Sequence, residues 1–317
     1  MKKLMNLVAG PVAAALLCVA SVSPSYAQAT AFVSGGGSGS VCTLAQPCRS
    51  IAIALALIAG NGGTVSCLDA GPYSEAFSGS ISYTLDCRGV VYTSPSGFAF
   101  SLGSGSPNPL VTFRHVIFDG AQGGAGAVTI ASGKVVFEDC TFQNYTAGSG
   151  EAVQFEPTVA GAQLTITDSV FAHNGTASGG GGIYIEPSAG ITAGAVIERT
   201  QVTGNTYGIV ANGFASGTVL AEVRYSTIAN SVFDGIWAVT QGTTASVVVE
   251  HSATIRNGGS GANAQGSNAY VSFSDSTIAW NATGLTTSGG GTNITYKNNV
   301  IGGNPNPGVT PYGLNLQ

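Results

Sequence analysis

Short segments with apolar residues at alternate positions recur along most of this chain. Three of them are VTFRHVIF at 111–118, VVFEDCTF at 135–142 and LTITDSVF at 164–171. Alternation with a period of two is typical of β-strands. The sixth residue of each segment marks the repeat, and successive marks are 23 to 31 residues apart. The marks are Val116, Cys140, Ser169, Thr200, Ser226, Ser252, Ser276 and Asn299.

Equivalent positions in these segments share their chemistry. The residue five before the mark is apolar from Val111 through to Ile294, and the residue three before it is apolar from Phe113 through to Tyr296. We therefore expect both positions to face a core. Asparagine suits tight turns and can hydrogen-bond along a stack of its copies. It recurs five residues after the mark at Asn174, Asn205, Asn257, Asn281 and Asn304.

A second short strand is predicted after each turn, as in AVTI (127–130), AVQF (152–155) and GIYI (182–185). A coil of roughly 25 residues cannot bury its own apolar face, whereas stacked coils share one continuous core. The sequence therefore predicts an all-β, right-handed parallel β-helix, or solenoid. A β-sandwich is the rival fold, but its strands need not repeat the same column chemistry at this spacing.

The N-terminal part follows a different pattern. Residues 1–27 contain Lys2 and Lys3, an apolar stretch and the exit Ser25-Tyr26-Ala27, which is typical of a signal peptide cleaved after Ala27. A retained anchor is the alternative, and no later stretch is long and apolar enough to span a membrane. We expect a secreted or periplasmic protein.

The apolar run IAIALALIAG at 51–60 predicts a short capping helix, because Pro47 precedes it and Gly62 follows it. Residues 28–63 would then form an N-terminal cap that contains this helix, and residues 64–317 would form the coils and a closing segment.

Charge and cysteine content narrow the functional classes. Charged residues are only 8% of the chain and the net charge is −5, which disfavours nucleic acid as a partner. Cys42 and Cys48 flank a short loop, and Cys67 and Cys87 lie in similar strands one rung apart, so both pairs can form disulfides in an oxidising compartment. The alternative is that these cysteines are small buried apolar residues. Cys140 is left over.

The most concentrated set of charges lies just before the marks. Glu138, Asp139, Asp168, Glu198 and Arg199 fall on neighbouring coils at positions that should point outward. Adjacent carboxylates can share a proton, hold Ca²⁺ or act as acid and nucleophile. The simpler interpretation is a solvated ladder of opposite charges, which contributes little to stability. Asp139, Asp168 and Arg199 are the candidate catalytic residues, and Glu138 and Glu198 are candidate binding residues.

Aromatic residues give a second set of candidates. Trp237 and Trp280, with Tyr184 and Tyr207, can stack on sugar rings, although packing within turns or the core explains them equally well.

The repeats, together with FVSGGGSGSVCTLAQPCRSIAIAL at 32–55, resemble the right-handed parallel β-helix superfamily that includes pectate lyases. That superfamily hosts lyases, hydrolases, epimerases and binding proteins, so the resemblance implies a fold more than an activity. Its lyases use Ca²⁺-bound carboxylates and a basic residue that removes a proton from a uronic acid, a role that Arg199 would take here. The strings Asn-Thr-Asp, Gly-His-Gly and Arg-Ile-Lys of polygalacturonases and Trp-Ile-Asp-His of pectate lyases are absent.

These observations favour a secreted, non-catalytic protein that binds glycans or another surface. Two alternatives remain open. The first is a polysaccharide lyase or glycoside hydrolase that acts on acidic polysaccharide and could use Ca²⁺, although the sequence establishes no cofactor. The second is a structural or adhesive surface protein.

Overall fold

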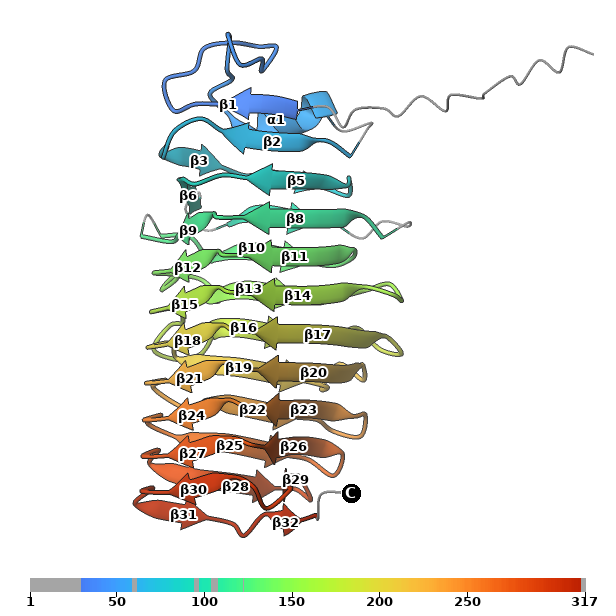
Figure 1. Ribbon diagram of the computed structural model, residues 1–317. Helices are drawn as coiled ribbons and strands as arrows, with labels where there is room; N and C mark the ends of the chain where they lie inside the picture. Colours follow the sequence, from blue (N-terminus) through green and yellow to red (C-terminus); the bar gives the residue numbers. More distant parts are fainter. Residues whose placement is uncertain (1–29, 59–61, 94–96, 104–107, 122, 315–317) are drawn as a thin grey trace, which may run out of the picture.

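The computed structural model describes residues 30–58, 62–93, 97–103, 108–121 and 123–314. The chain winds into stacked coils, and three parallel sheets form the three faces around the coil axis (Figure 1). Sheets A, B and C contain twelve, ten and ten strands, and each strand pairs with its equivalent in the next coil. The predicted parallel β-helix is therefore confirmed. The predicted signal peptide, residues 1–27, lies outside the described residues.

Apart from the first and last strands of sheet A, which extend that sheet at its two ends, each coil contributes one strand to each sheet in the order A, B, C. Sheet A consists of β1 (Thr30–Val33), β2 (Thr64–Cys67), β5 (Tyr83–Asp86), β8 (Leu110–Arg114), β11 (Lys134–Glu138), β14 (Gln163–Thr167), β17 (Thr192–Glu198), β20 (Thr218–Arg224), β23 (Ala245–Glu250), β26 (Ala269–Ser274), β29 (Thr292–Thr295) and β32 (Tyr312–Gly313). Sheet B consists of β3 (Tyr73–Glu75), β6 (Val90–Thr93), β9 (Ile117–Asp119), β12 (Thr141–Gln143), β15 (Val170–Ala172), β18 (Gln201–Thr203), β21 (Thr227–Ala229), β24 (Ala253–Ile255), β27 (Thr277–Ala279) and β30 (Val300–Gly302). Sheet C consists of β4 (Phe77–Gly79), β7 (Phe98–Leu102), β10 (Gly126–Ile130), β13 (Glu151–Phe155), β16 (Gly181–Ile185), β19 (Tyr207–Asn212), β22 (Ile236–Val239), β25 (Ser260–Gln265), β28 (Thr283–Ser288) and β31 (Asn306–Gly308).

The core is filled by apolar columns that run along the coil axis. Phenylalanines of successive coils stack face to face, with ring centroids 4.8 Å apart for Phe118 and Phe142 and 4.4 Å apart for Phe142 and Phe171. Later coils replace these rings with smaller residues such as Val202 and Ile228, which are fully buried. The two predicted inward columns are buried as well, from Val111 to Val271 and from Phe113 to Phe273, which confirms them for these coils.

A left-handed residue turns the chain from sheet A into sheet B. The position just before the mark has φ between 47° and 59°, which L-residues rarely adopt. It is occupied by His115, Asp139, Asp168, Arg199, Tyr225, His251 and Asp275. The hydroxyl at the mark then satisfies buried backbone groups, since Ser252 Oγ accepts from Ser226 N at 3.0 Å and donates to Glu250 O at 2.7 Å. The charged residues at this corner therefore occupy equivalent positions at the C-terminal ends of the sheet A strands.

The predicted asparagine ladder occupies the corner between sheets B and C. Asn174 Nδ2 donates to Asn205 Oδ1 at 2.9 Å, and Asn257 Nδ2 donates to Asn281 Oδ1 at 2.8 Å. These four side chains are buried, and the ladder satisfies them by bonding coil to coil. Ser231 interrupts the ladder between its two halves.

The last coil differs from the sequence prediction. We expected Ile294 and Tyr296 to face the core, but Ile294 pairs with the outward residue Ser272, and Asn293 and Thr295 are buried instead. The left-handed residue of this coil is Lys297, two positions before Asn299 rather than one. The turn holds one extra residue, and a slip of one residue exchanges the two faces of a strand.

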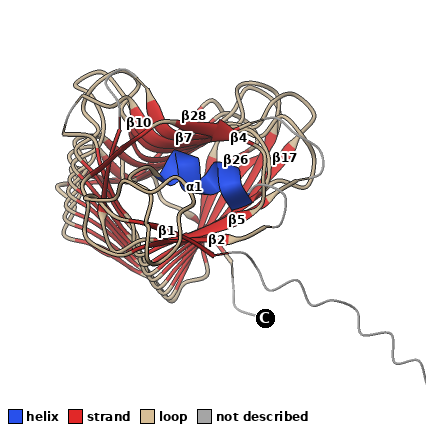
Figure 2. Cartoon of the chain, turned by 90° about the horizontal axis from the view of Figure 1, so that it is seen from above, coloured by secondary structure: helices blue, strands red, loops and turns tan. Residues whose placement is uncertain are grey.

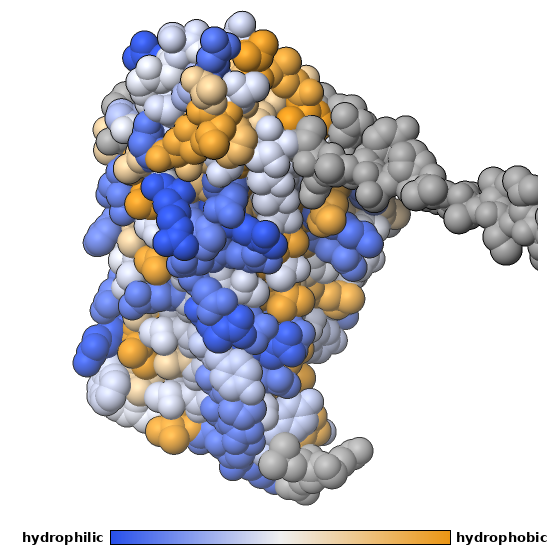
Figure 3. Space-filling model, turned by 45° about the horizontal axis from the view of Figure 1, so that its top comes forward, coloured by the Kyte–Doolittle hydropathy of each residue, from blue (hydrophilic) through white to orange (hydrophobic). Residues whose placement is uncertain are grey.

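Helix α1 (Ile51–Ile58) covers the N-terminal end of the coil (Figure 2). It buries Ile51, Leu55 and Ile58 and leaves Ile53 and Leu57 exposed. The predicted capping helix is thus confirmed, and the last residues of its predicted range, 59 and 60, lie outside the described residues. Figure 3 shows hydrophobic surface gathered at this end of the molecule. Among the described residues, no helix has the length and hydropathy that a membrane crossing requires.

Both predicted disulfides are present. Cys42 and Cys48, and Cys67 and Cys87, are bonded, with Cα–Cα distances of 4.6 Å in each pair. Such bonds are compatible with an oxidising extracellular or periplasmic compartment. Cys140 is a buried free thiol whose pKa burial raises to about 12, so it is inert at neutral pH.

Candidate functional site

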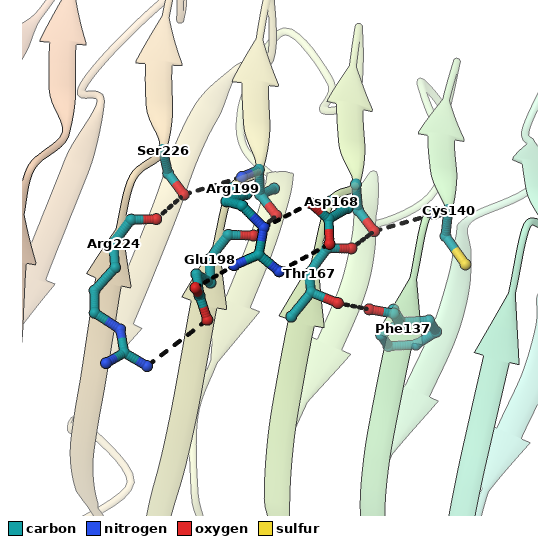
Figure 4. Close-up of polar contacts among 10 residues, drawn as sticks. Phe137, Cys140, Thr167, Asp168, Glu198, Arg199, Arg224 and Ser226 are labelled. Carbon is teal, nitrogen blue, oxygen red and sulfur yellow. Dashed lines mark hydrogen bonds and ion pairs between the residues drawn. The ribbon is translucent and has the colours of Figure 1, made fainter.

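The charged residues singled out in the sequence belong to one row of side chains at the C-terminal ends of the sheet A strands, and Figure 4 shows its central part, with Asp168, Glu198, Arg199 and Arg224. We call it the charged ridge, and it comprises Arg114, Glu138, Asp139, Asp168, Glu198, Arg199 and Arg224. Its members are either the last outward residue of a sheet A strand or the left-handed residue that follows it. The strict coil repeat therefore places them in two adjacent columns.

Asp168 and Arg199 are locked together on neighbouring coils. Arg199 Nε lies 2.7 Å from Asp168 Oδ1, and its Nη2 lies 2.9 Å from Asp168 Oδ2. Hydrogen bonds from Arg199, with its positive charge, lower the pKa of Asp168. Both oxygens of Asp168 are engaged, and the carboxylates around Arg199 raise its pKa. In this geometry Arg199 is a poor proton acceptor and Asp168 is a poor general acid.

Four other residues of the ridge, Glu198, Arg224, Arg114 and Glu138, also have charged partners. Arg199 Nη1 donates to Glu198 Oε1, while Arg224 Nη2 lies 3.8 Å from Glu198 Oε2. At the N-terminal end of the ridge, Arg114 Nε donates to Glu138 Oε2 at 2.5 Å. These side chains are partly or largely exposed, so each pair contributes little to stability.

Asp139 lies apart from the Asp168–Arg199 pair and close to a histidine. His115 Nε2 is 3.9 Å from Asp139 Oδ2, while His115 Nδ1 is 2.9 Å from Asp86 Oδ1. Asp86 was not identified from the sequence, because it lies on β5, before the regular repeat begins. Within the described part of the chain, no group of three or more Asp, Glu, His or Cys residues is arranged to hold a metal ion.

A shallow groove of about 460 Å³ lies beside the ridge on the outer face of sheet A. It crosses β14, β17, β20 and β23, and its lining includes Gln163, Thr165, Val196, Leu220, Glu222 and Ser246. A side chain at Gly194 would meet nothing within 4 Å, so this glycine keeps the middle of the groove open. The groove could not be predicted from the sequence, because its lining consists of outward residues that follow no apolar pattern.

Glu222 is the only ionisable residue in the groove lining. Its Oε1 lies 3.3 Å from Arg224 Nε, but the same arginine also faces Glu198, so the charge of Glu222 is compensated only in part. Leu220 is 49% exposed and presents an apolar surface to the groove. The lining thus combines apolar carbon with amide and hydroxyl groups.

The two candidate tryptophans lie on other faces. Trp237 is on β22 of sheet C, where its ring stacks on Tyr207 with centroids 5.3 Å apart. Trp280 follows β27 of sheet B, is 57% exposed, and lies under Arg256, whose guanidinium carbon is 5.4 Å from the ring centroid. Neither tryptophan therefore lies with the ridge.

Comparisons with known proteins agree with this fold. Residues 79–220 match the family described as the right handed beta helix region. The A-module of mannuronan C-5 epimerase AlgE4 from Azotobacter vinelandii is similar in structure at 14% identity and a TM-score of 0.43, over 89% of this chain and 98% of that one. Pectate lyase Pel9A is similar at 14% identity and a TM-score of 0.41, over 90% of this chain and 77% of that one.

These structural likenesses are too weak to bear on chemistry. A search of curated protein sequences finds no significant match. The coil topology shows the fold that the resemblance in sequence implied, a right-handed parallel β-helix, and the family match over residues 79–220 agrees with it.

Proposed function

We propose that this chain binds a glycan without modifying it, and that the groove on sheet A is the binding surface. The observation that carries the proposal is the groove's lining, in which exposed Leu220 and half-buried Val196 lie among the polar side chains of Gln163, Thr165 and Ser246. Sugars present both C–H faces and hydroxyl groups, so they match an open surface of mixed character. The groove follows the coil axis across four strands, as an extended chain requires.

The pairing of the ridge supports binding over catalysis. General acid–base chemistry requires a carboxyl group whose proton is free to move at the working pH. Asp168 is instead held by Arg199, and Glu222 lies against Arg224. The beta-helix fold hosts polysaccharide-acting enzymes as well as binding proteins, so the fold does not decide between the two.

The charge of the groove favours a neutral ligand. Its only ionisable lining residue is a carboxylate, Glu222, which would repel an acidic polysaccharide. A neutral, hydroxyl-rich polysaccharide meets no such repulsion. The alternative lyase or hydrolase would act on acidic polysaccharide through Asp139, Asp168 and Arg199, and would thus prefer the opposite class of ligand.

The test is a panel of neutral and acidic polysaccharides, each measured with and without Ca²⁺. Affinity electrophoresis would report binding, and reducing ends and unsaturated-end absorbance would report turnover. Leu220→Asp places a charge in the groove and should weaken binding about tenfold. Leu110→Asp is the matched control, because Leu110 is equally exposed on sheet A but lies outside the groove.

Each outcome separates the candidate functions. Binding of a neutral polysaccharide that Leu220→Asp weakens and Leu110→Asp does not would support the proposal. Turnover that Asp168→Ala abolishes would establish the enzyme instead. A chain that neither binds nor cleaves any member of the panel would favour the structural or adhesive protein.

A further inference from the structure

The outer face of sheet C has a character of its own. Its outward residues come from β13, β16, β19, β22 and β25, and one column along the coil axis passes through Gln154, Tyr184, Val210, Trp237 and Asn263. Figure 2 shows sheet C on the side of the coil opposite β1 and β2, with loops at both of its margins. This face is therefore separate from the groove on sheet A.

Three aromatic rings lie together on this face. The Tyr207 ring is 5.3 Å from the Trp237 ring at an interplanar angle of 26°, and 5.1 Å from the Phe233 ring at 33°. Phe233 is 39% exposed, in the turn that leads into β22. Tyr207 lies nearly parallel to both other rings, so the rings cover one another's faces, and Phe233 presents the exposed surface of this aromatic platform, on which a flat apolar surface can stack.

Four carboxylates lie on this face or at its margins, and Asp234, which follows Phe233 in the chain, is the one beside the platform. Glu151 and Glu156 flank β13, Glu186 follows β16, and Asp234 precedes β22. No lysine or arginine occurs in any described strand of sheet C, and none of the ion pairs among the described residues involves these four carboxylates.

The carboxylates are held in place by neutral donors. Tyr184 OH donates to Glu186 at 2.8 Å, and Gln154 Nε2 donates to Glu151 at 2.9 Å. Asn263 Nδ2 donates to Asp234 at 2.9 Å. Burial, and then the neighbouring charges of Glu186 and Glu151, raise the pKa of Glu156. The carboxylates of Glu151, Glu186 and Asp234 are thus fixed in position, and no lysine or arginine among the described ion pairs compensates their charge.

We propose that the outer face of sheet C binds a glycan built of amino sugars with free, protonated amines. A sugar ring would stack on Phe233, and the ammonium groups of an extended chain would pair with Asp234 and with the carboxylates farther along the face. Charge complementarity selects a cationic ligand, while the ring platform and the amide groups of Asn212 and Asn263 select a sugar over a simple polyamine. This site does not depend on the proposed groove, and either can fail alone.

The experiment uses tryptophan emission as a local reporter. The chain has two tryptophans, so Trp280→Phe leaves Trp237 as the only one. Fully deacetylated glucosamine hexamer is titrated into this chain at mildly acidic pH and low salt, alongside the N-acetylated hexamer and hexalysine. We expect the glucosamine hexamer alone to change Trp237 emission, with an affinity that falls as salt is added.

Two further variants test the recognition. Phe233→Ser removes an exposed ring and should weaken binding roughly five- to tenfold. Glu186→Gln should weaken it up to about fivefold, as the loss of one exposed ion pair does. Glu250→Gln is the matched control, because it neutralises a partly exposed carboxylate on sheet A and should leave the affinity unchanged.

Several results would overturn the proposal. They are no binding of the glucosamine hexamer, equal binding of the N-acetylated hexamer, or an affinity that Phe233→Ser leaves unchanged. Equal binding of hexalysine would show a surface that selects charge alone. Thermal unfolding of each variant, close to that of the parent, would establish that a loss of binding is not a loss of folding.

Discussion

The charged ridge and the outer face of sheet C both carry carboxylates, yet their surroundings act in opposite directions. On the ridge, hydrogen bonds from Arg199 lower the pKa of Asp168. On sheet C, partial burial and two neighbouring glutamates raise the pKa of Glu156. The same kind of group is thus stabilised as an anion in one region and destabilised as an anion in the other.

This contrast separates charge that is already compensated from charge that is available to a ligand. The coil repeat brings equivalent residues of neighbouring coils together, so Arg114, Arg199 and Arg224 each lie against a carboxylate of an adjacent coil. Sheet C has no such cation in the residues described, and its anions repel one another. We infer that the paired carboxylates of the ridge are less available to a ligand than the carboxylates of sheet C, which take part in no ion pair among the described residues.

The largest effect on stability is expected at a carboxylate that is held by neutral donors alone. Asp69 accepts hydrogen bonds from Ser34 Oγ at 2.6 Å, Tyr73 OH at 2.8 Å, and the backbone amides of Gly35 and Gly71 at 3.0 Å. These bonds, led by that of Ser34, place the pKa of Asp69 far below its ordinary value. Asp69→Ala should destabilise the N-terminal cap by about 1 to 2 kcal/mol, the lower part of the range for bonds to a charged acceptor, because the site is exposed.

Hydrogen exchange at the Gly35 and Gly71 amides measures this clasp directly. Because the folded pKa is depressed, the stabilisation is present above the unfolded pKa of roughly 3.9 and is lost as the pH falls through the folded value. Exchange in the parent should therefore accelerate in strong acid, whereas exchange in Asp69→Ala should already be fast at neutral pH. Asp275→Ala, an exposed carboxylate without this clasp, is the control. Unchanged protection of Gly35 in Asp69→Ala would contradict the assignment.

The next effect has the opposite sign and tests the crowding on sheet C. The raised pKa of Glu156 means that its charge destabilises the folded chain at neutral pH. Glu156→Gln should stabilise the chain by roughly 0.5 to 1 kcal/mol at neutral pH, as interactions between partly exposed charges do. The gain should vanish below the unfolded pKa, where both chains are uncharged at this position. Urea unfolding at neutral and acidic pH would measure it, and a loss of stability at neutral pH would refute the crowding.

The sequence predicted the parts of the molecule that packing constrains. Inward residues such as Phe113 and Phe137, the asparagine ladder and the second strands all follow from columns that must match from coil to coil. The disulfide between Cys67 and Cys87 was foreseen for the same reason, because equivalent positions lie one rung apart. The slip at Ile294 was missed, since one residue inserted in a turn leaves the apolar pattern almost unchanged.

Outward residues are less predictable, because nothing in the core constrains them. The proximity of Asp168 and Arg199 could be expected from the coil spacing, but their two-point pairing depends on rotamers that the sequence does not encode. Glu156 and Glu186 lie where the second strands end and loops of variable length begin, so no repeat pattern brought them together. The groove depends on Gly194, a position that stands out only once neighbouring side chains are in place.

The smallest effect on stability, and the sharpest test of the comparison, is expected at Arg199. Arg199→Gln removes the two-point contact with Asp168, so the pKa of Asp168 should rise towards its ordinary value. Carbon NMR of the side-chain carboxyl groups would follow this titration. Because both side chains are about half exposed, the thermal midpoint at neutral pH should stay close to that of the parent. Arg114→Gln breaks the pair with Glu138 at the other end of the ridge and should leave Asp168 unchanged. If the pKa of Asp168 stays low in Arg199→Gln, the ridge does not owe its compensation to arginine, and its difference from sheet C must arise from solvent exposure alone.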